Sequence, residues 1–167
     1  MADTHILVMS DTHGNYKAVQ QLLDTYLKHV SAVIHLGDIT QDLISHNKTG
    51  LENFHIVNGN VDFMGNPDYE ERVIELSGKK IFITHGHRYS VKSGLDNLVY
   101  KAQELGVNAC LFGHTHQQIM FKQDGILFLN PGSPTYPRVG SEKGYALLRI
   151  SEEGAISAKL LAYRTQI

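Results

Sequence analysis

The chain has 167 residues, of which 42% are hydrophobic and 19% are charged, and its formal net charge is −2. This composition predicts one globular domain covering residues 1–167. The small net charge argues against a stable nucleic-acid complex or a charged membrane surface as partner. No apolar run approaches the roughly 18 residues of a membrane span. Cys110 is the only cysteine, so no internal disulfide can form, and we expect a cytoplasmic protein.

Strands and helices are predicted to alternate in the first half of the chain, in the pattern that gives parallel strand pairs. Asn15 is a suitable N-terminal cap for the first helix. The expected strands occupy 5–10, 32–36 and 54–57, and the expected helices occupy 16–29 and 40–48.

Hairpins dominate the second half, because tight-turn sequences such as Ser77-Gly78 and Asp124-Gly125 separate short apolar runs. They are predicted over 72–84, 117–129 and 145–163. A helix over 92–105, capped by Ser93 and stopped by Gly106, precedes a strand over 107–112. The whole pattern predicts an α/β domain of two packed sheets with helices outside. The edges of the last two hairpins leave a homo-oligomer as an open possibility.

Side chains that bind metals follow five of the predicted strands, where open α/β sheets place their sites. Each group alone is an ordinary turn sequence, but five groups in one short chain predict a metal centre. Carboxylate, imidazole and amide ligands without cysteine suit Mn²⁺, Fe²⁺, Zn²⁺ or Ni²⁺. In chain order the groups are Asp11 with His13, Asp38, Asn60 with Asp62, His85 with His87, and His114 with His116.

The two histidines of the last group stand two residues apart on an irregular turn, so their rings can point in different directions. They can then ligate two ions that lie a few ångströms apart, and a polar turn with two solvated histidines is the alternative. Gly113 before them is predicted to permit a sharp bend and the close approach of other groups.

The combined pattern resembles the calcineurin-like metallophosphoesterases, and in particular the small single-domain phosphodiesterases of bacteria and archaea. The matching motifs are Asp11-x-His13, Gly37-Asp38, Gly59-Asn60-x-Asp62, Thr84-His85-Gly86-His87 and Gly113-His114-x-His116, within residues 6–137. The resemblance implies a four-layer α/β/β/α sandwich of two mixed β-sheets flanked by helices. It also implies a first metal on Asp11, His13, Asp38 and His116, and a second on Asp38, Asn60, His85 and His114.

The implied reaction is hydrolysis of a small phosphoester, in which a hydroxide bridging two divalent ions attacks phosphorus in line. Manganese is the expected metal, and Asp38 would bridge the two ions. Larger family members have a proton-donating histidine where this chain has Val61. His87 is therefore the candidate proton donor, with orientation of a ligand or contact with substrate as its alternative. Asp62, grouped with the catalytic residues, is expected to hydrogen-bond within its own loop or behind the ligands.

Three functions stay open at this point. The first is a phosphodiesterase, and the second is a phosphomonoesterase or nucleotidase. The third is a binding scaffold, as in a retromer subunit that resembles this branch but is altered at its metal positions. Intact motif residues favour an enzyme, and Val61 favours diesters. The segment 130–133 is either a tight loop or part of the site lining, and His35 is expected to be a core histidine.

Overall fold

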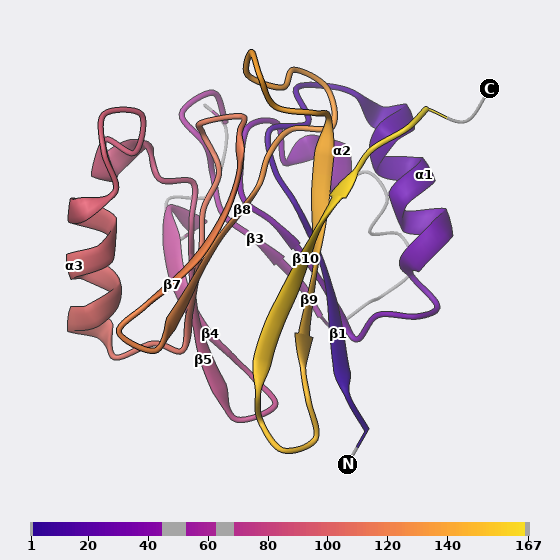
Figure 1. Cartoon of the computed structure of the whole chain (residues 1–167). Helices are drawn as coiled ribbons and strands as arrows, with labels where there is room; N and C mark the ends of the chain where they lie inside the picture. The colour runs from indigo at the N-terminus through magenta and orange to yellow at the C-terminus, as the bar shows by residue number, and fades with distance from the viewer. Residues whose placement is uncertain (1, 45–52, 63–68, 166–167) are drawn as a thin grey trace.

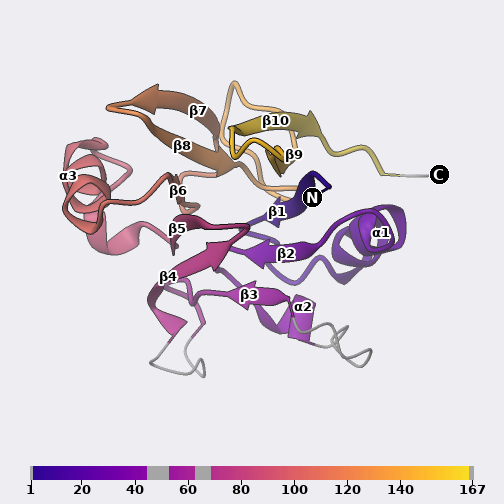
Figure 2. The same cartoon turned by 90° about the horizontal axis from the view of Figure 1, so that it is seen from below.

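The computed structural model describes residues 2–44, 53–62 and 69–165. Two five-stranded sheets face each other, and helices cover the outer face of each sheet (Figure 1). Figure 2 shows the four layers from below. The predicted α/β/β/α sandwich is therefore confirmed. Among the helices of the described residues, none has both the length and the apolarity needed to cross a membrane.

The first sheet is mixed. Its strand order is β10-β9-β1-β2-β3, with β1, β2 and β3 parallel and β9 antiparallel to both of its neighbours. Helices α1 and α2 cover its outer face, and the Asn15 side chain caps α1 by accepting from the Ala18 amide at 3.1 Å. The elements are β1 (Thr4–Met9), α1 (Tyr16–Tyr26), β2 (Ala32–His35), α2 (Gln41–Ile44), β3 (Phe54–Ile56), β9 (Gly144–Ile150) and β10 (Ile156–Ala162).

The second sheet is also mixed, in the order β4-β5-β6-β8-β7, with β5, β6 and β8 parallel. Helix α3 covers its outer face (Figure 2). The antiparallel pairs β4–β5, β7–β8 and β9–β10 confirm the three predicted hairpins. The elements are β4 (Glu71–Leu76), β5 (Lys79–Thr84), the 3₁₀ helix η3 (His87–Tyr89), α3 (Asp96–Leu105), β6 (Ala109–Leu111), β7 (Gln118–Gln123) and β8 (Ile126–Pro131).

Strand alternation divides the core into three layers. Ile6 and Val8 of β1 point between the sheets, where they join buried residues of both sheets. Leu7 and Met9 point the other way and pack with Leu22 and Leu23 of α1 and other apolar residues. Since β1 is buried on both faces, its sequence is a continuous apolar run rather than an alternating one.

Three predicted boundaries are wrong. Helix α1 ends at Tyr26 rather than near residue 29, because the amide of His29 bonds to the Tyr26 carbonyl and tightens the last turn to 3₁₀ geometry. Helix α3 begins at Asp96, and Ser93 instead belongs to a turn in which its amide bonds to the Ser90 carbonyl. Gly106 does end α3 in the left-handed conformation.

The third error concerns the tight loop predicted over 130–133. Asn130 and Pro131 continue β8, where they pair with Ile119 and Gln118 of β7. The β7–β8 ladder thus runs two residues further than the apolar residues of β8. The predicted short helix over 40–48 is seen as α2, and its second half lies outside the described residues.

Candidate metal centre

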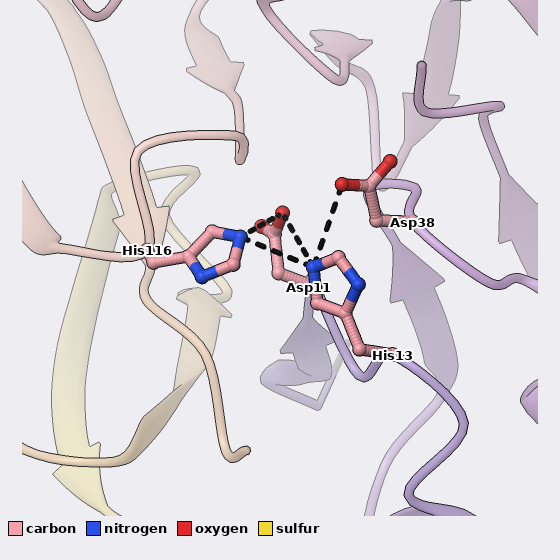
Figure 3. Close-up of side chains that lie close together, drawn as sticks. All are labelled: Asp11, His13, Asp38 and His116. Atoms are coloured by element: carbon pink, nitrogen blue, oxygen red, sulfur yellow. Dashed lines mark hydrogen bonds and ion pairs between the residues drawn. The ribbon is translucent and has the colours of Figure 1, made fainter. Parts of the chain in front are cut away.

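Four predicted ligands from three different loops meet beside the ends of β1 and β2. His116 Nε2 lies 3.1 Å from Asp11 Oδ1 and 3.1 Å from His13 Nε2. His13 Nε2 in turn lies 3.5 Å from Asp38 Oδ2. Figure 3 shows these four side chains pointing toward one another. One potential ligand atom from each of the four residues lies within 4.8 Å of the others, so the cluster can surround one ion.

A second cluster consists of Asp38, His85 and His114. His85 Nε2 lies 3.1 Å from His114 Nδ1 and 3.4 Å from Asp38 Oδ1. Two nitrogens that are each about 2.1 Å from one ion stand roughly 3.0–3.4 Å apart. The nitrogen pairs in both clusters therefore have the spacing of metal ligands.

Asp38 belongs to both clusters, and its two carboxylate oxygens face different histidines. Oδ2 is the oxygen near His13, whereas Oδ1 is the oxygen near His85. A carboxylate can use both oxygens as acceptors, so one side chain can serve two neighbouring ions. His114 and His116 fall into different clusters, which is the divergence that their spacing suggested.

Asp11 provides the test of whether a cation fits. Its Oδ2 accepts hydrogen bonds from the Ser10 hydroxyl and the His114 amide, at 2.6 and 3.0 Å. Its Oδ1 is fully buried and accepts no hydrogen bond from any residue that the structure describes. A buried carboxylate oxygen without a donor is costly. Nε2 atoms of three histidines, His13, His85 and His116, surround this oxygen at 3.1–4.0 Å. A bound cation would remove this cost, so the residues fit a metal.

Backbone carbonyls orient two of the histidines. His85 Nδ1 lies 2.7 Å from the carbonyl oxygen of Leu36, and His116 Nδ1 lies 2.6 Å from that of Tyr136. Each ring donates its Nδ1–H to the carbonyl, which leaves Nε2 as the nitrogen available to a metal. This is the arrangement that metal-ligating histidines commonly adopt.

At two positions, the local pKa favours the protonation state that can bind a metal. Burial alone would raise the pKa of Asp11, but His116, His85 and the Ser10 hydroxyl hold it below its ordinary value. Burial and the nearby His85 lower the pKa of His114 to about 4. His116 is the exception, since its contact with the Asp11 carboxylate raises its pKa. A proton on His116 therefore competes with a metal as pH falls.

The family of this chain follows from its sequence as well as its geometry. Residues 4–153 match the model of the calcineurin-like phosphoesterase superfamily domain. The chain is a calcineurin-like metallophosphoesterase. This family depends on divalent metals, and the match confirms the resemblance carried by the five motifs.

Relatives and solved structures agree with this family. The chain is 34% identical to a probable metallophosphoesterase of Bacillus subtilis, over 90% of this chain and 87% of that protein. A phosphodiesterase of Methanocaldococcus jannaschii is 29% identical, over 75% and 81% of the two chains. A crystal structure of a predicted phosphoesterase from Streptococcus pneumoniae superposes with a TM-score of 0.80 at 37% identity, covering 98% and 91%.

One further likeness concerns the fold alone. Vacuolar protein sorting 29 from Cryptosporidium parvum superposes on this metallophosphoesterase with a TM-score of 0.75 at 21% identity, covering 96% of this chain and 98% of that one. The same sandwich is therefore used by a sorting protein.

The ligand loops of the metallophosphoesterase have an unusual backbone. The residues with positive φ among its predicted ligands are Asp11, His13, Asp38, His114 and His116, with φ between 48° and 67°. Such conformations cost energy in residues other than glycine and collect at functional sites. They turn side chains of adjacent strands toward one point. Gly113 itself is not among the residues with positive φ, so the predicted sharp bend lies in the two histidines that follow it.

Two glycines give the centre its close packing. A Cβ on Gly59 would overlap the Asp38 carboxylate, and a Cβ on Gly113 would overlap the Ser10 hydroxyl. The predicted close approach at Gly113 is therefore present. At both positions the missing side chain leaves the space in which a ligand carboxylate or its hydrogen-bond partner sits.

The third motif of the metallophosphoesterase lies against Asp38. The amide of Val61 lies 3.3 Å from Asp38 Oδ1, and Asn60 is an exposed residue between Val61 and Gly59. The Asp62 carboxylate accepts hydrogen bonds from four backbone amides, those of Asp38, Ile39, Thr40 and Gly59, at 2.6–3.0 Å. Asp62 thus faces the backbone behind the ligands rather than the space between them.

His87 opens the 3₁₀ helix η3 on the side of the second cluster. Its ring centroid lies 5.4 Å from that of His85 and 6.0 Å from that of His114. Burial and the nearby His85 lower the pKa of His87. Its Nδ1 is buried and has no hydrogen-bond partner among the described residues.

Sequence reasoning missed the groups that hold the ligand loops. Ser133 donates its hydroxyl to the Asp11 carbonyl at 2.8 Å, and the Asn130 amide donates to the Gly113 carbonyl at 2.8 Å. The segment 130–133 is thus neither a free loop nor a simple lining, because it ties two ligand loops together. A polar pair such as Asn130 and Ser133 around a Pro-Gly turn is too common to signal this role.

Proposed function

We propose that this metallophosphoesterase is a two-metal phosphodiesterase that acts on a small phosphoester by in-line displacement at phosphorus. The observation that carries the proposal is the pair of ligand clusters that share Asp38. Seven side chains would hold the metals, and we assign them as the sequence does. Asp11, His13, Asp38 and His116 take the first ion, and Asp38, Asn60, His85 and His114 take the second.

Two bound divalent ions would supply activation of water and neutralisation of charge on the phosphate. Mn²⁺ is the ion we expect, with Ni²⁺, Fe²⁺ or Zn²⁺ also compatible with these ligands. The chain itself joins the two clusters through one shared carboxylate, that of the buried Asp38. The backbone bonds to His85 and His116 keep the metal-binding nitrogens aimed at the clusters without movement.

Proton donation to the leaving group is assigned to the protonated form of His87, which its lowered pKa makes a stronger acid. Val61 offers no proton at the position where larger family members have a histidine. His87 is the half-buried imidazole next to the second cluster, and neither of the proposed ligand sets includes it. Asp62, by contrast, acts as a positioning residue, since four backbone amides occupy its carboxylate.

The alternatives find less support. A scaffold needs none of the ligands, yet every predicted ligand position in the five motifs carries a residue that can bind metal. A phosphomonoesterase or nucleotidase must expel a leaving group from a more highly charged phosphate. The aliphatic side chain of Val61 gives no help there, which favours diesters. The relative named as a phosphodiesterase points in the same direction.

The test compares bis-p-nitrophenyl phosphate with p-nitrophenyl phosphate on protein stripped of metal and reloaded with Mn²⁺. We expect turnover of the diester that depends on metal and exceeds turnover of the monoester. Asp38→Asn removes one negative oxygen from the shared ligand. It should reduce turnover by more than the roughly 10- to 100-fold that loss of an outer hydrogen-bond partner costs.

Metal analysis separates the remaining outcomes. A protein that binds no metal and turns over neither ester would support the scaffold. Faster turnover of the monoester would identify a phosphomonoesterase. A trapped phosphoenzyme, or product phosphate without labelled solvent oxygen, would contradict direct displacement.

A further inference from the structure

An exposed aromatic ring stands beside the first ligand cluster. The ring of Tyr136 lies 5.8 Å from the ring of His13, edge to face at 63°. Tyr136 is 61% exposed, so most of its ring faces solvent. Its carbonyl is the group that accepts the Nδ1–H of His116. Tyr136 thus contacts two proposed ligands of the first metal while it keeps a free aromatic surface.

The loop that carries Tyr136 is held firmly to the ligand loops. Ser133 Oγ accepts the amides of Thr135 and Tyr136, at 3.1 and 2.9 Å. The Thr135 hydroxyl donates to the Thr12 carbonyl at 2.8 Å, and the Arg138 amide donates to the His116 carbonyl at 2.9 Å. In Figure 1 this segment follows β8 as the orange loop at the top of the sandwich. These bonds hold the backbone of Tyr136 beside the first cluster.

A rigid, exposed tyrosine next to a reaction centre offers a planar apolar face at little cost in conformational entropy. Aromatic rings and nucleobases stack on such faces, and the stacking tolerates different rings because each has a π-face. The phosphate would lie at the clusters, so a substituent one ester bond away can reach the adjoining ring.

The two ends of the centre differ in character. His87 lies beside His85 and His114 of the second cluster, whereas Tyr136 lies beside His13 and His116 of the first. The leaving group belongs at the end with the proton donor. The substituent that stays on phosphorus then belongs at the end with Tyr136.

We infer that Tyr136 forms a stacking subsite for an aryl or nucleobase substituent that is retained on the phosphate. This inference rests on the proposed phosphodiesterase function and narrows its substrates to diesters with one planar substituent. Stacking here raises the affinity for the substrate and leaves the chemistry of the leaving group unchanged.

The experiment uses two diesters with the same leaving group, p-nitrophenyl phenyl phosphate and methyl p-nitrophenyl phosphate, and the Mn²⁺-loaded protein. We expect a higher kcat/KM for the phenyl ester. Tyr136→Ala should reduce the phenyl-to-methyl ratio of kcat/KM roughly tenfold, the size of one lost stacking contact. Tyr136→Phe should keep the ratio, because stacking needs the ring and not the hydroxyl.

Tyr100→Ala is the matched control, since Tyr100 is 68% exposed on α3, a helix that contributes no residue to either cluster. It should leave the ratio unchanged. Metal content and Tm of each variant show whether the His116 loop stays intact. An equal loss on both esters in Tyr136→Ala would contradict the subsite.

A binding measurement keeps the two proposals separable. Calorimetry on the Mn²⁺-loaded protein should give a roughly tenfold lower Kd for phenylphosphonate than for methylphosphonate, and Tyr136→Ala should abolish the difference. If neither diester is hydrolysed but this preference is found, the phosphodiesterase proposal fails while the aromatic subsite stands. Equal affinities for the two phosphonates would overturn the subsite.

Discussion

At the scale of single residues, Val61 and His87 raise the question of which group donates a proton to the leaving group. Val61 leaves the third motif without a protic side chain, and its amide contacts the shared carboxylate. His87 lies at the second cluster, and its buried Nδ1 has no partner in the described part of the chain. A proton donor affects poor leaving groups most, because a good leaving group departs as an anion without help. Leaving-group dependence therefore separates proton donation from positioning.

His87→Ala should lower turnover of methyl phenyl phosphate by roughly a hundredfold, within the range for general acid catalysis. The same variant should affect methyl p-nitrophenyl phosphate several times less, since p-nitrophenolate leaves readily. Steady-state rates on the two esters, with metal content measured for each variant, check the difference. Equal losses on both esters would instead show that His87 orients a ligand or contacts the substrate.

At the scale of elements, the loop after β3 is hydrogen-bonded to the backbone of the loop after β2. Asp38 and Ile39 both have positive φ, of 62° and 69°. Such a φ is a marked outlier for the β-branched Ile39. The Asp62 carboxylate binds the backbone amides of both residues, so it stabilises the conformation that aims the Asp38 side chain at the clusters.

Asp62→Asn should therefore weaken the metal centre without touching a ligand. The amide NH₂ of asparagine would face backbone donors in place of an oxygen. We expect a loss of roughly 2–4 kcal/mol in unfolding free energy and metal affinity about 10- to 100-fold lower. Chemical denaturation and calorimetric titration with Mn²⁺ measure the two effects. Saturating Mn²⁺ should restore much of the turnover, whereas a rate that stays abolished at full metal occupancy would indicate a direct catalytic role.

At the scale of the whole molecule, a buried polar network on the outer face of the first sheet joins β2 to the ligand loops. His35 Nδ1 accepts the Gly37 amide, and its Nε2 lies 3.1 Å from the Thr12 hydroxyl. That hydroxyl donates to Asp42 at 2.8 Å. Burial lowers the pKa of His35 to about 4, which means that the folded protein holds this ring neutral. The expected core histidine is thus confirmed as buried and hydrogen-bonded.

This pKa makes folding stability depend on pH. The unfolded chain protonates His35 near pH 6.5, whereas the folded chain does so only near pH 4, so the unfolded state binds more protons between these values. The contribution is fully present above pH 6.5 and is lost as pH falls toward 4, by up to about 3 kcal/mol. Urea unfolding of the metal-free protein at several pH values should show this slope.

His35→Gln should reduce the slope between pH 6.5 and 4, even if it lowers stability at every pH. The slope that remains includes the contribution of His114, whose pKa is also lowered to about 4. The exposed His29→Gln is the matched control and should keep the wild-type slope. A His35→Gln variant with the wild-type slope would assign the pH dependence to other groups.

The sequence alone determined the layers and the chemistry. The apolar run at 6–9 indicated a strand buried on both faces, and Ser77-Gly78 and Asp124-Gly125 indicated the hairpins, because these signals are local. The ligand types after each strand indicated a metal centre, since parallel strands bring their carboxyl ends to one edge.

Only the tertiary structure decided how these groups are arranged. The division of His114 and His116 between two clusters depends on positive φ angles that contacts from distant loops enforce. The support of Asp38 by Asp62, and of His116 by the Tyr136 carbonyl, joins residues 24 and 20 positions apart in the chain. No local pattern encodes such contacts, because they arise only when the sheets pack and the loops at one edge meet.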